Sequence, residues 1–150
     1  MIIKKYTQFI KESSGYEFGC VMVEVPVSNW DEITSSIDPE DIFQGEGGDP
    51  KGIQNNTHLT LLYPVIGDIK YEQVKDVLKS ILDKEIIIKI DGIDIFENDK
   101  FDVVKFNIKN NDYLNKIHNK LKSKIPNDDK FETYKPHITI GYTKKGTSPL

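Results

Sequence analysis

The chain has 150 residues, of which 37% are hydrophobic and 29% charged, and its formal net charge is −4. A chain of this length can bury about 70% of the surface that its unfolded form exposes, so we expect one domain, residues 1–150. No apolar run approaches the roughly 18 residues of a membrane span, and an acidic chain suits duplex nucleic acid poorly, so we expect neither a membrane nor a duplex as partner.

The amino terminus and the cysteine content favour a cytoplasmic protein. The first 15 residues interleave charged and apolar side chains and lack the continuous apolar stretch of a secretory signal. Cys20 is the one cysteine, which excludes a disulfide framework within the monomer. Its apolar neighbours favour a buried, unreactive thiol.

Charge is unevenly distributed along the chain. Residues 1–108 carry 11 lysines against 20 acidic residues, whereas residues 109–150 carry 9 lysines against 4. All 20 basic residues are lysines, so a phosphate must be bound by ammonium groups, hydroxyls, imidazoles or backbone N–H groups rather than by guanidinium. The basic final third suits an anionic ligand, although a solvated helix face explains many of these charges equally well.

The first half of the chain predicts a strand, a helix, a long loop and a second strand, in that order. Before them, residues 1–15 have apolar side chains at helical spacing and predict a short N-terminal helix. Residues 19–25 predict a buried strand, and residues 29–37 a short helix. The Gly-, Pro- and acid-rich residues 38–56 predict a long loop, which is either a functional lid or a disordered segment. Residues 57–63 predict a strand.

The second half repeats several of these signals. Residues 71–82 predict an amphipathic helix with one apolar stripe. Residues 85–96 and 101–109 predict two strands joined by a hairpin turn. A lysine-rich helix over 111–125 and a strand over 137–143 complete the chain.

The two halves share one order of elements: strand, helix, loop and a strand that begins with histidine. The first set runs over residues 19–58 and the second over 101–137. This repetition indicates a duplication at the level of topology rather than of sequence identity. An α+β domain with two related lobes, roughly residues 19–83 and 84–150, would bring the two final strands close to a common axis.

Each half ends in the same tripeptide, H-x-T, at residues 58–60 and 137–139. Because side chains alternate across a strand, the histidine and threonine of one motif share a face. One imidazole can take a proton from an attacking hydroxyl or water while the other, protonated, gives one to the leaving oxygen. The threonines can donate hydrogen bonds to the non-bridging phosphate oxygens. The pattern predicts phosphodiester chemistry by His58, Thr60, His137 and Thr139.

A single copy of the motif would more often be a half-exposed surface pair, and the repetition is what favours a site. Two histidines can also be zinc ligands, but no carboxylate or cysteine has ligand-like spacing to either motif. We therefore expect no metal and no other cofactor. His118 lies near the apolar stripe of its predicted helix, and we interpret it as a histidine at the core boundary.

With these motifs in its duplicated order, the chain resembles the 2H phosphoesterase superfamily, named for two H-x-[ST] motifs in a bilobal α+β fold. The phrases "GYEFGCVMV", "DPEDIF" and "YKPHITIGYTKKG" are similar to those of phage anti-CBASS enzymes of this superfamily, which degrade the cyclic di- and trinucleotide signals of bacterial antiphage defence. The resemblance implies two pseudo-symmetric lobes with antiparallel sheets around a central cleft and helices outside.

The same resemblance implies an activity: metal-independent cleavage of 3′–5′ bonds in cyclic oligonucleotides such as 3′,3′-cGAMP. The ribose 2′-OH attacks its own phosphate, and water can then hydrolyse the resulting 2′,3′-cyclic phosphate. Carried over by position, His58 and His137 are the acid–base pair, and Thr60 and Thr139 hold the phosphate. Which histidine is the base stays open, and a phage-encoded enzyme would act in the cytoplasm of its bacterial host.

One position departs from the expected pattern. The second motif is preceded by Pro136, but the first is preceded by Thr57. A proline would restrict the backbone before the histidine, so we expect the first motif to be less rigid.

Base recognition is predicted from aromatic residues, since stacking contributes roughly 1–3 kcal/mol per base and tolerates different bases. Strict alternation places the tyrosines that follow each motif by three residues on the opposite face, unless the strand bulges there. A lysine beside the second motif could attract phosphate. The candidates are Tyr16, Phe18, Phe43, Tyr63, Tyr142 and Lys144.

Two other functions fit the same four residues. A 2H phosphodiesterase acting on RNA 2′,3′-cyclic phosphate ends or on 2′–5′ oligoadenylate would use the same chemistry on another substrate. A non-catalytic module would sequester a nucleotide without cleaving it, but such a module needs no pair of groups that change protonation.

Overall fold

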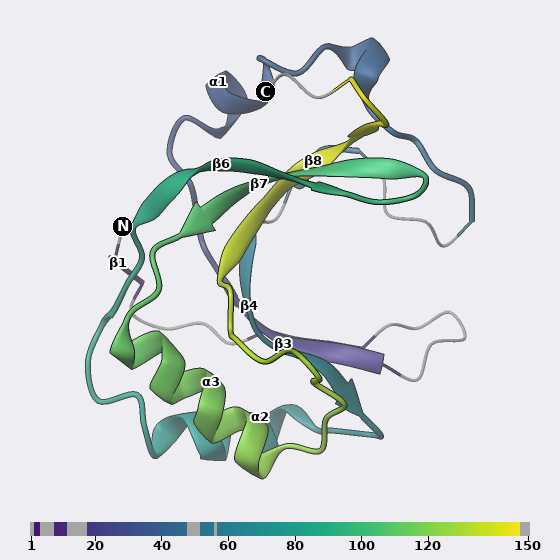
Figure 1. Cartoon of the computed structure of the whole chain (residues 1–150). Coiled ribbons are helices and arrows are strands. Elements are labelled where there is room, and N and C mark those ends of the chain that lie inside the picture. Colours follow the sequence, from purple (N-terminus) through teal and green to yellow (C-terminus); the bar gives the residue numbers. More distant parts are fainter. Residues whose placement is uncertain (1, 4–7, 12–17, 48–51, 56, 148–150) are drawn as a thin grey trace.

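The computed structural model describes residues 2–3, 8–11, 18–47, 52–55 and 57–147. Figure 1 shows a curved sheet whose strands are contributed by the whole length of the chain, with two helices packed at one end. Among the described residues, none of the helices combines the length and the apolarity that crossing a lipid bilayer requires.

A six-stranded antiparallel sheet with the order β2-β3-β4-β8-β7-β6 forms the centre of the fold. Its strands are β2 (Gln8–Lys11), β3 (Phe18–Glu24), β4 (His58–Ile66), β6 (Ile90–Glu97), β7 (Phe101–Ile108) and β8 (His137–Lys144). A second, two-stranded sheet pairs β1 (Ile2–Ile3) with β5 (Ile86–Ile87). The helices are α1 (Trp30–Thr34), the 3-10 turn η1 (Pro39–Asp41), α2 (Tyr71–Lys79) and α3 (Asp112–Lys124).

The sheet consists of two related halves. β2, β3 and β4 lie on one side of its centre, and β6, β7 and β8 lie on the other in the mirrored order. The predicted repetition is confirmed, because β3, α1, a loop and β4 correspond to β7, α3, a loop and β8. β4 and β8, which begin with the two histidines, are neighbours at the centre of the sheet.

The helix predicted over residues 1–15 is wrong for the part of that segment that the structure describes. Residues 8–11 form β2, in which Phe9 lies opposite Val21 of β3, and residues 2–3 form β1. An isolated helix shorter than about 12–15 residues is marginal in water. Pairing with the edge of β3 gives the backbone N–H and C=O groups of this segment hydrogen-bond partners. This tertiary pairing therefore outweighs the weak helical preference that the spacing of the apolar residues indicated.

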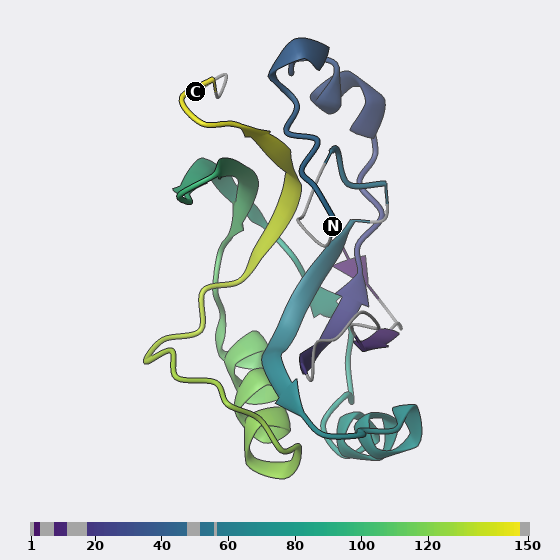
Figure 2. The same cartoon turned by 90° about the vertical axis from the view of Figure 1, so that its right-hand side faces the viewer.

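The hydrophobic core lies between one face of the sheet and the helices α2 and α3, which lie together at one end of the molecule (Figure 2). The middle residues of the two motifs, Leu59 and Ile138, are both 0% exposed. They belong to the same cluster as Leu114, Ile117 and Leu121 of α3. Because this core contains residues of both halves of the sheet, packing holds the two motifs in one body.

The described part of the predicted loop over 38–56 is attached to β8. The backbone N–H of Phe43 donates to the Tyr142 carbonyl oxygen at 2.9 Å, and the N–H of Tyr142 donates to the Gly52 carbonyl oxygen at 3.0 Å. The N–H of Gln54 donates to the Ile140 carbonyl oxygen at 3.0 Å. Beyond Ile138, the edge of β8 no longer pairs with β4, and these bonds occupy that edge instead. The described parts of the loop therefore extend the sheet and are not a free flap.

Gly141 lies at the contact between this loop and β8. A Cβ atom at Gly141 would come within 2.8 Å of Ile53 Cδ1 and 3.1 Å of the Gly52 carbonyl oxygen. We expect Gly141→Ala to lower the free energy of unfolding by about 1–3 kcal/mol, because the loop must shift to admit the methyl group. Urea unfolding measures this loss. In an Ile53→Ala background the same substitution should cost less, and an equal cost in both backgrounds would contradict the contact.

Candidate active site

The two H-x-T motifs lie side by side on β4 and β8. Leu59 lies opposite Ile138 in the antiparallel pair, which places the histidine of each motif opposite the threonine of the other. Side chains directly opposite each other have Cβ atoms about 4.5–5.5 Å apart. Since Leu59 and Ile138 point into the core, the flanking residues point to the other face. This two-by-two array consists of His58, Thr139, Thr60 and His137.

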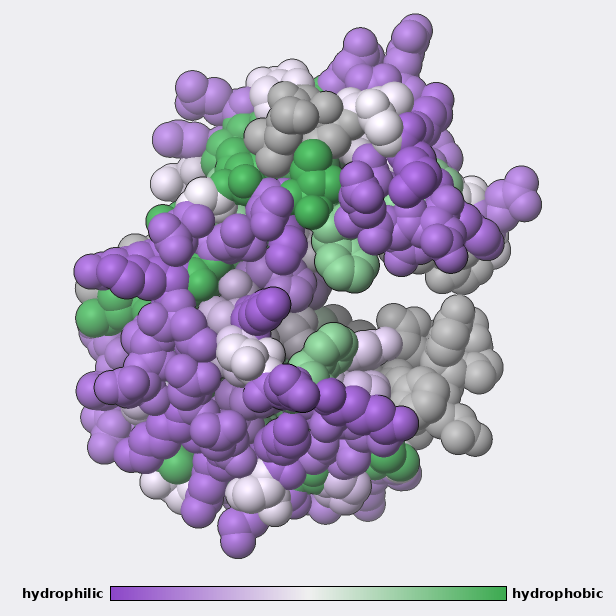
Figure 3. Space-filling view, viewed as in Figure 1, coloured by the Kyte–Doolittle hydropathy of each residue, from purple (hydrophilic) through white to green (hydrophobic). Residues whose placement is uncertain are grey.

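The array lies where the two halves of the sheet meet. Among the described residues, β4 and β8 are joined by the single pair of Leu59 and Ile138, and beyond it each strand continues with its own half. Figure 3 shows a deep notch between the two halves of the molecule, which opens to solvent on one side. All four side chains of the array are half-buried, between the packed core and the solvent.

His137 is arranged as a proton acceptor. Its Nδ1 lies 3.1 Å from the Lys135 carbonyl oxygen, which can only accept, so Nδ1 carries the hydrogen and Nε2 of the neutral ring keeps its lone pair. Burial lowers the pKa of His137, and the charges of Lys105 and His58 lower it further, against the hydrogen bond to Lys135. The neutral imidazole therefore persists at a lower pH than usual, which suits a general base.

Charged residues on the flanking strands make the array asymmetric. Lys105 of β7 lies opposite Thr139, and Glu24 of β3 lies opposite His58. Opposite residues share a face of the sheet, so an ammonium group flanks one motif and a carboxylate flanks the other. Sequence reasoning missed both residues. Alternation in β7 indicates that Lys105 points away from the core, but only the strand order shows that it faces the array.

A bulge turns Tyr142 toward the array. The register between β7 and β8 shifts by one residue just after Thr139, so β8 carries an extra residue there. Tyr142 consequently pairs with Val103, which shares a face with Lys105. Strict alternation would have placed Tyr142 on the opposite face. The bulge instead brings Tyr142, and two residues later the exposed Lys144, to the face of the array, where burial raises the pKa of Tyr142.

β4 contains a similar irregularity. Its register against β3 shifts between Thr60, which pairs with Met22, and Leu62, which pairs with Val21. Leu62 therefore lies on the core side, and the next residue, Tyr63, points to the side of Thr60. Tyr63 is 52% exposed, so its ring is accessible beside the first motif.

The structure describes two of the other three aromatic residues proposed for base recognition. Phe43 packs against Phe101, with ring centroids 5.0 Å apart, and Phe101 packs edge-on against Tyr142 at 5.6 Å. Phe43 is thus joined to Tyr142 through a third ring. Phe18 lies in β3, and Tyr16 lies outside the described residues.

Thr57, which stands where a proline was expected, is fixed by hydrogen bonds. Its buried hydroxyl donates to the Val25 carbonyl oxygen, and the N–H of Val25 donates to the Thr57 carbonyl oxygen at 2.9 Å. Two bonds to the segment that follows β3 hold the residue before His58. These bonds supply a local restraint at the position where the second motif has Pro136.

Two other residues that the sequence singled out lie outside the array. His118 is buried, at 7% exposed, rather than at the core boundary. Cys20 is half-buried in β3 rather than fully buried. Within the part of the chain that the structure describes, no three or more His, Cys, Asp or Glu side chains are grouped so that they could hold a metal ion.

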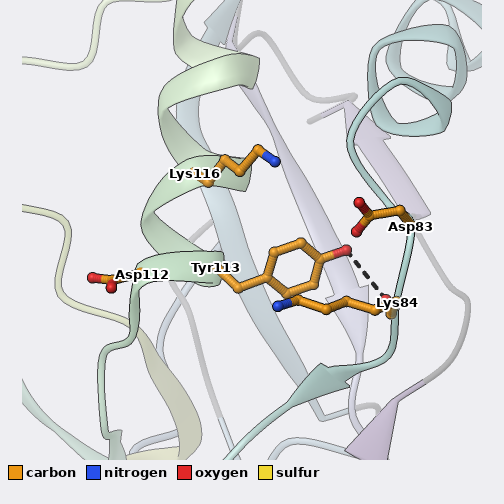
Figure 4. A pocket seen from close by; sticks show the side chains of 5 residues that line it. All are labelled: Asp83, Lys84, Asp112, Tyr113 and Lys116. Atoms are coloured by element: carbon orange, nitrogen blue, oxygen red, sulfur yellow. Dashed lines mark hydrogen bonds between the residues drawn. The ribbon is translucent and has the colours of Figure 1, made fainter.

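A pocket of about 360 Å³ lies away from the array, beside the start of α3 (Figure 4). Tyr113 crosses it, with its hydroxyl donating to the Lys84 carbonyl oxygen at 3.2 Å and the Lys84 ammonium 4.7 Å from the centre of its ring. The lining combines two acidic and two basic side chains and contains no histidine. The imidazoles that the sequence analysis singled out for proton transfer thus lie in the array and not in this pocket. Its lining is Asp83, Lys84, Asp112, Tyr113 and Lys116.

A protein-family model matches most of the chain. It is the model of the 2′-5′ RNA ligase superfamily, and it matches residues 26–149, which include both motifs. The chain belongs to this superfamily. The match confirms the resemblance to the 2H phosphoesterases at the level of the superfamily. Comparison with curated proteins and with solved structures found no match.

The placement of Lys105 beside His137 has a measurable consequence. We expect Lys105→Met to raise the pKa of His137, because the ammonium charge disfavours the imidazolium form. The pH titration of the histidine Cε1–H NMR signals measures this pKa, and with three histidines in the chain single substitutions assign each signal. Lys116→Met, on the exposed side of α3, should leave the titration unchanged. Equal titrations in both variants would contradict the placement.

Proposed function

We propose that this chain is a metal-independent phosphodiesterase that cleaves the 3′–5′ bonds of cyclic di- and trinucleotide immune signals, such as 3′,3′-cGAMP. In this proposal it serves a phage against the CBASS defence of its bacterial host and acts in the host cytoplasm. The observation that carries the proposal is the array of two imidazoles and two hydroxyls on one face of β4 and β8. Membership of the superfamily supports it.

The first step opens the ring of the cyclic nucleotide. Nε2 of His137 takes the proton of a ribose 2′-OH, and the 2′ oxygen bonds to the adjacent phosphorus. The bond between phosphorus and the 5′ oxygen breaks, and the His58 imidazolium gives its proton to that oxygen. The products are a 2′,3′-cyclic phosphate and a free 5′-OH on one linear chain. In a second step, water can hydrolyse the cyclic phosphate with the two proton transfers reversed.

The flanking strands distinguish the roles of the two histidines. His137 has its Nδ1 hydrogen bonded to a carbonyl, leaving Nε2 to accept a proton, and Lys105 beside it disfavours a second positive charge. His58 is the other imidazole of the array, and it lies opposite Glu24 rather than a lysine. We therefore assign His137 as the base and His58 as the acid of the first step.

The other groups of the array act on the phosphate. The hydroxyls of Thr60 and Thr139 donate to the non-bridging oxygens, on which charge increases in the transition state. Lys105, opposite Thr139, supplies a positive charge on the same face. Because the chain has no arginine, a positive charge for the phosphate must come from lysine or imidazolium. Tyr63 and Tyr142 are available on that face for stacking on the bases.

The description of the family favours a second candidate. A 2′-5′ RNA ligase superfamily is named for RNA substrates, and the same four residues would act on RNA 2′,3′-cyclic phosphate ends or on 2′–5′ oligoadenylate. A module that binds nucleotides without cleaving them is the third candidate, and the proton acceptor geometry of His137 disfavours it.

The direct test is cleavage of 3′,3′-cGAMP in excess EDTA, followed by chromatography of linear products. We expect wild-type activity to persist and His58→Ala and His137→Ala each to lose about 10²- to 10⁴-fold in rate, with Lys116→Met as the control. Loss of activity in EDTA would contradict a metal-independent mechanism. Cleavage of RNA 2′,3′-cyclic ends alone would favour the second candidate, and binding of nucleotides with no cleavage would favour the third.

A substrate with a good leaving group tests which histidine is the acid. A ribonucleoside 3′-(4-nitrophenyl) phosphate has a 2′-OH to be deprotonated, but its nitrophenolate leaves without a proton. We expect His58→Ala to recover most of its lost rate on this substrate and His137→Ala to remain impaired, because the base is still needed. Release of nitrophenolate is measured by absorbance. The reverse pattern would exchange the two roles.

A further inference from the structure

A cluster of the buried His118, the half-buried Tyr134 and Asp129 lies behind the first motif. The imidazole of His118 stacks on the Tyr134 ring, with centroids 4.3 Å apart and planes inclined by 8°. Nε2 of His118 lies 3.4 Å from Oδ2 of Asp129, whose side chain is 3% exposed and also lies 3.7 Å from the Lys122 ammonium. The cluster is outside the array, and the proposed proton transfers do not use it.

Both rings contact carbonyl groups of β4. The Tyr134 hydroxyl donates to the Thr60 carbonyl oxygen at 2.7 Å, and Nδ1 of His118 donates to the Leu61 carbonyl oxygen at 2.7 Å. These two carbonyls lie where the register of β4 against β3 shifts. A bulge interrupts the regular hydrogen bonds between strands, and buried backbone groups need partners. His118 and Tyr134 supply the donors at this point.

Tyr134 also belongs to the segment that leads into the second motif. It precedes His137 by three residues, and the carbonyl of Lys135, between them, accepts the hydrogen bond from Nδ1 of His137. The backbone of Tyr134 is held from the other side, where Nδ2 of Asn110 donates to its carbonyl oxygen at 3.0 Å. One tyrosine therefore connects the threonine of the first motif to the approach of the second.

We propose that Tyr134 and His118 are positioning residues that set the separation and orientation of the two H-x-T motifs. Tyr134 connects the two motifs through its hydroxyl. His118 holds the Tyr134 ring by stacking and fixes the bulge of β4, with Asp129 on the other side of its own ring. The catalytic consequence of this inference rests on the proposed function, whereas its geometric consequence does not.

Tyr134→Phe removes the connecting hydroxyl and changes none of the four side chains of the array. We expect kcat on the cleaved substrate to fall by about 10- to 100-fold, because small displacements of reacting groups have effects of that size. KM should change less than about twofold, since the phosphate contacts remain. The matched control is Tyr113→Phe, on α3, whose hydroxyl donates to the Ile81 and Lys84 carbonyl oxygens at 3.2 Å, away from the motifs.

A second readout does not depend on activity. Burial lowers the pKa of His137, so a loosened motif that admits water should raise it. The His137 Cε1–H titration should therefore move to higher pH in Tyr134→Phe and stay unchanged in Tyr113→Phe. The groups that face His137, namely His58 on β4, Lys105 on β7 and the Lys135 carbonyl, are the same in both variants.

These two readouts separate the inference from the proposed function. If the wild-type protein cleaves no substrate, the titration still decides whether Tyr134 positions the motifs. If Tyr134→Phe fails to fold, His118→Gln, which keeps a donor for Leu61 but loses the stacking ring, should show the same titration shift. Wild-type kcat and an unchanged His137 titration in a folded Tyr134→Phe variant would overturn the inference.

Discussion

The pairing of Leu59 with Ile138 at the centre of the sheet is the contact on which the site depends. Both side chains are fully buried, so alternation directs the histidine and threonine on either side of each to the opposite face. A slip of one residue in this pair would turn the imidazoles into the core and expose the apolar residues. The hydrophobic core therefore fixes the register in which the four polar groups meet.

A duplicated scaffold supplies equivalent positions to two histidines, to which the proposed mechanism gives different protonation states. The strand order places each motif beside one other strand, β3 or β7, and these two strands are not alike in charge. Lys105 comes from one and Glu24 from the other. The pseudo-symmetry of the fold thus brings the imidazoles together, and the flanking strands give the two motifs different charged neighbours.

Irregularities in the two central strands extend the site beyond the four motif residues. An extra residue in each strand reverses the alternation, so that Tyr63 and Tyr142 return to the face of the array. The interrupted ladder in β4 is completed by side chains of α3 and of the segment that precedes β8, and the free edge of β8 is completed by the loop that precedes β4. Local departures from the regular sheet therefore determine which side chains and loop segments surround the array.

The sequence by itself determined the order of the elements, the two motifs and the common face of histidine and threonine within each, because these follow from periodicities over a few residues. It predicted a helix for the segment in which β2 pairs with the edge of β3. It could not show that Lys105 and Glu24 flank the array or that His118 contacts β4. Those features depend on which strands are neighbours and in what register. Only the packing of distant segments decides that, since no local pattern encodes it.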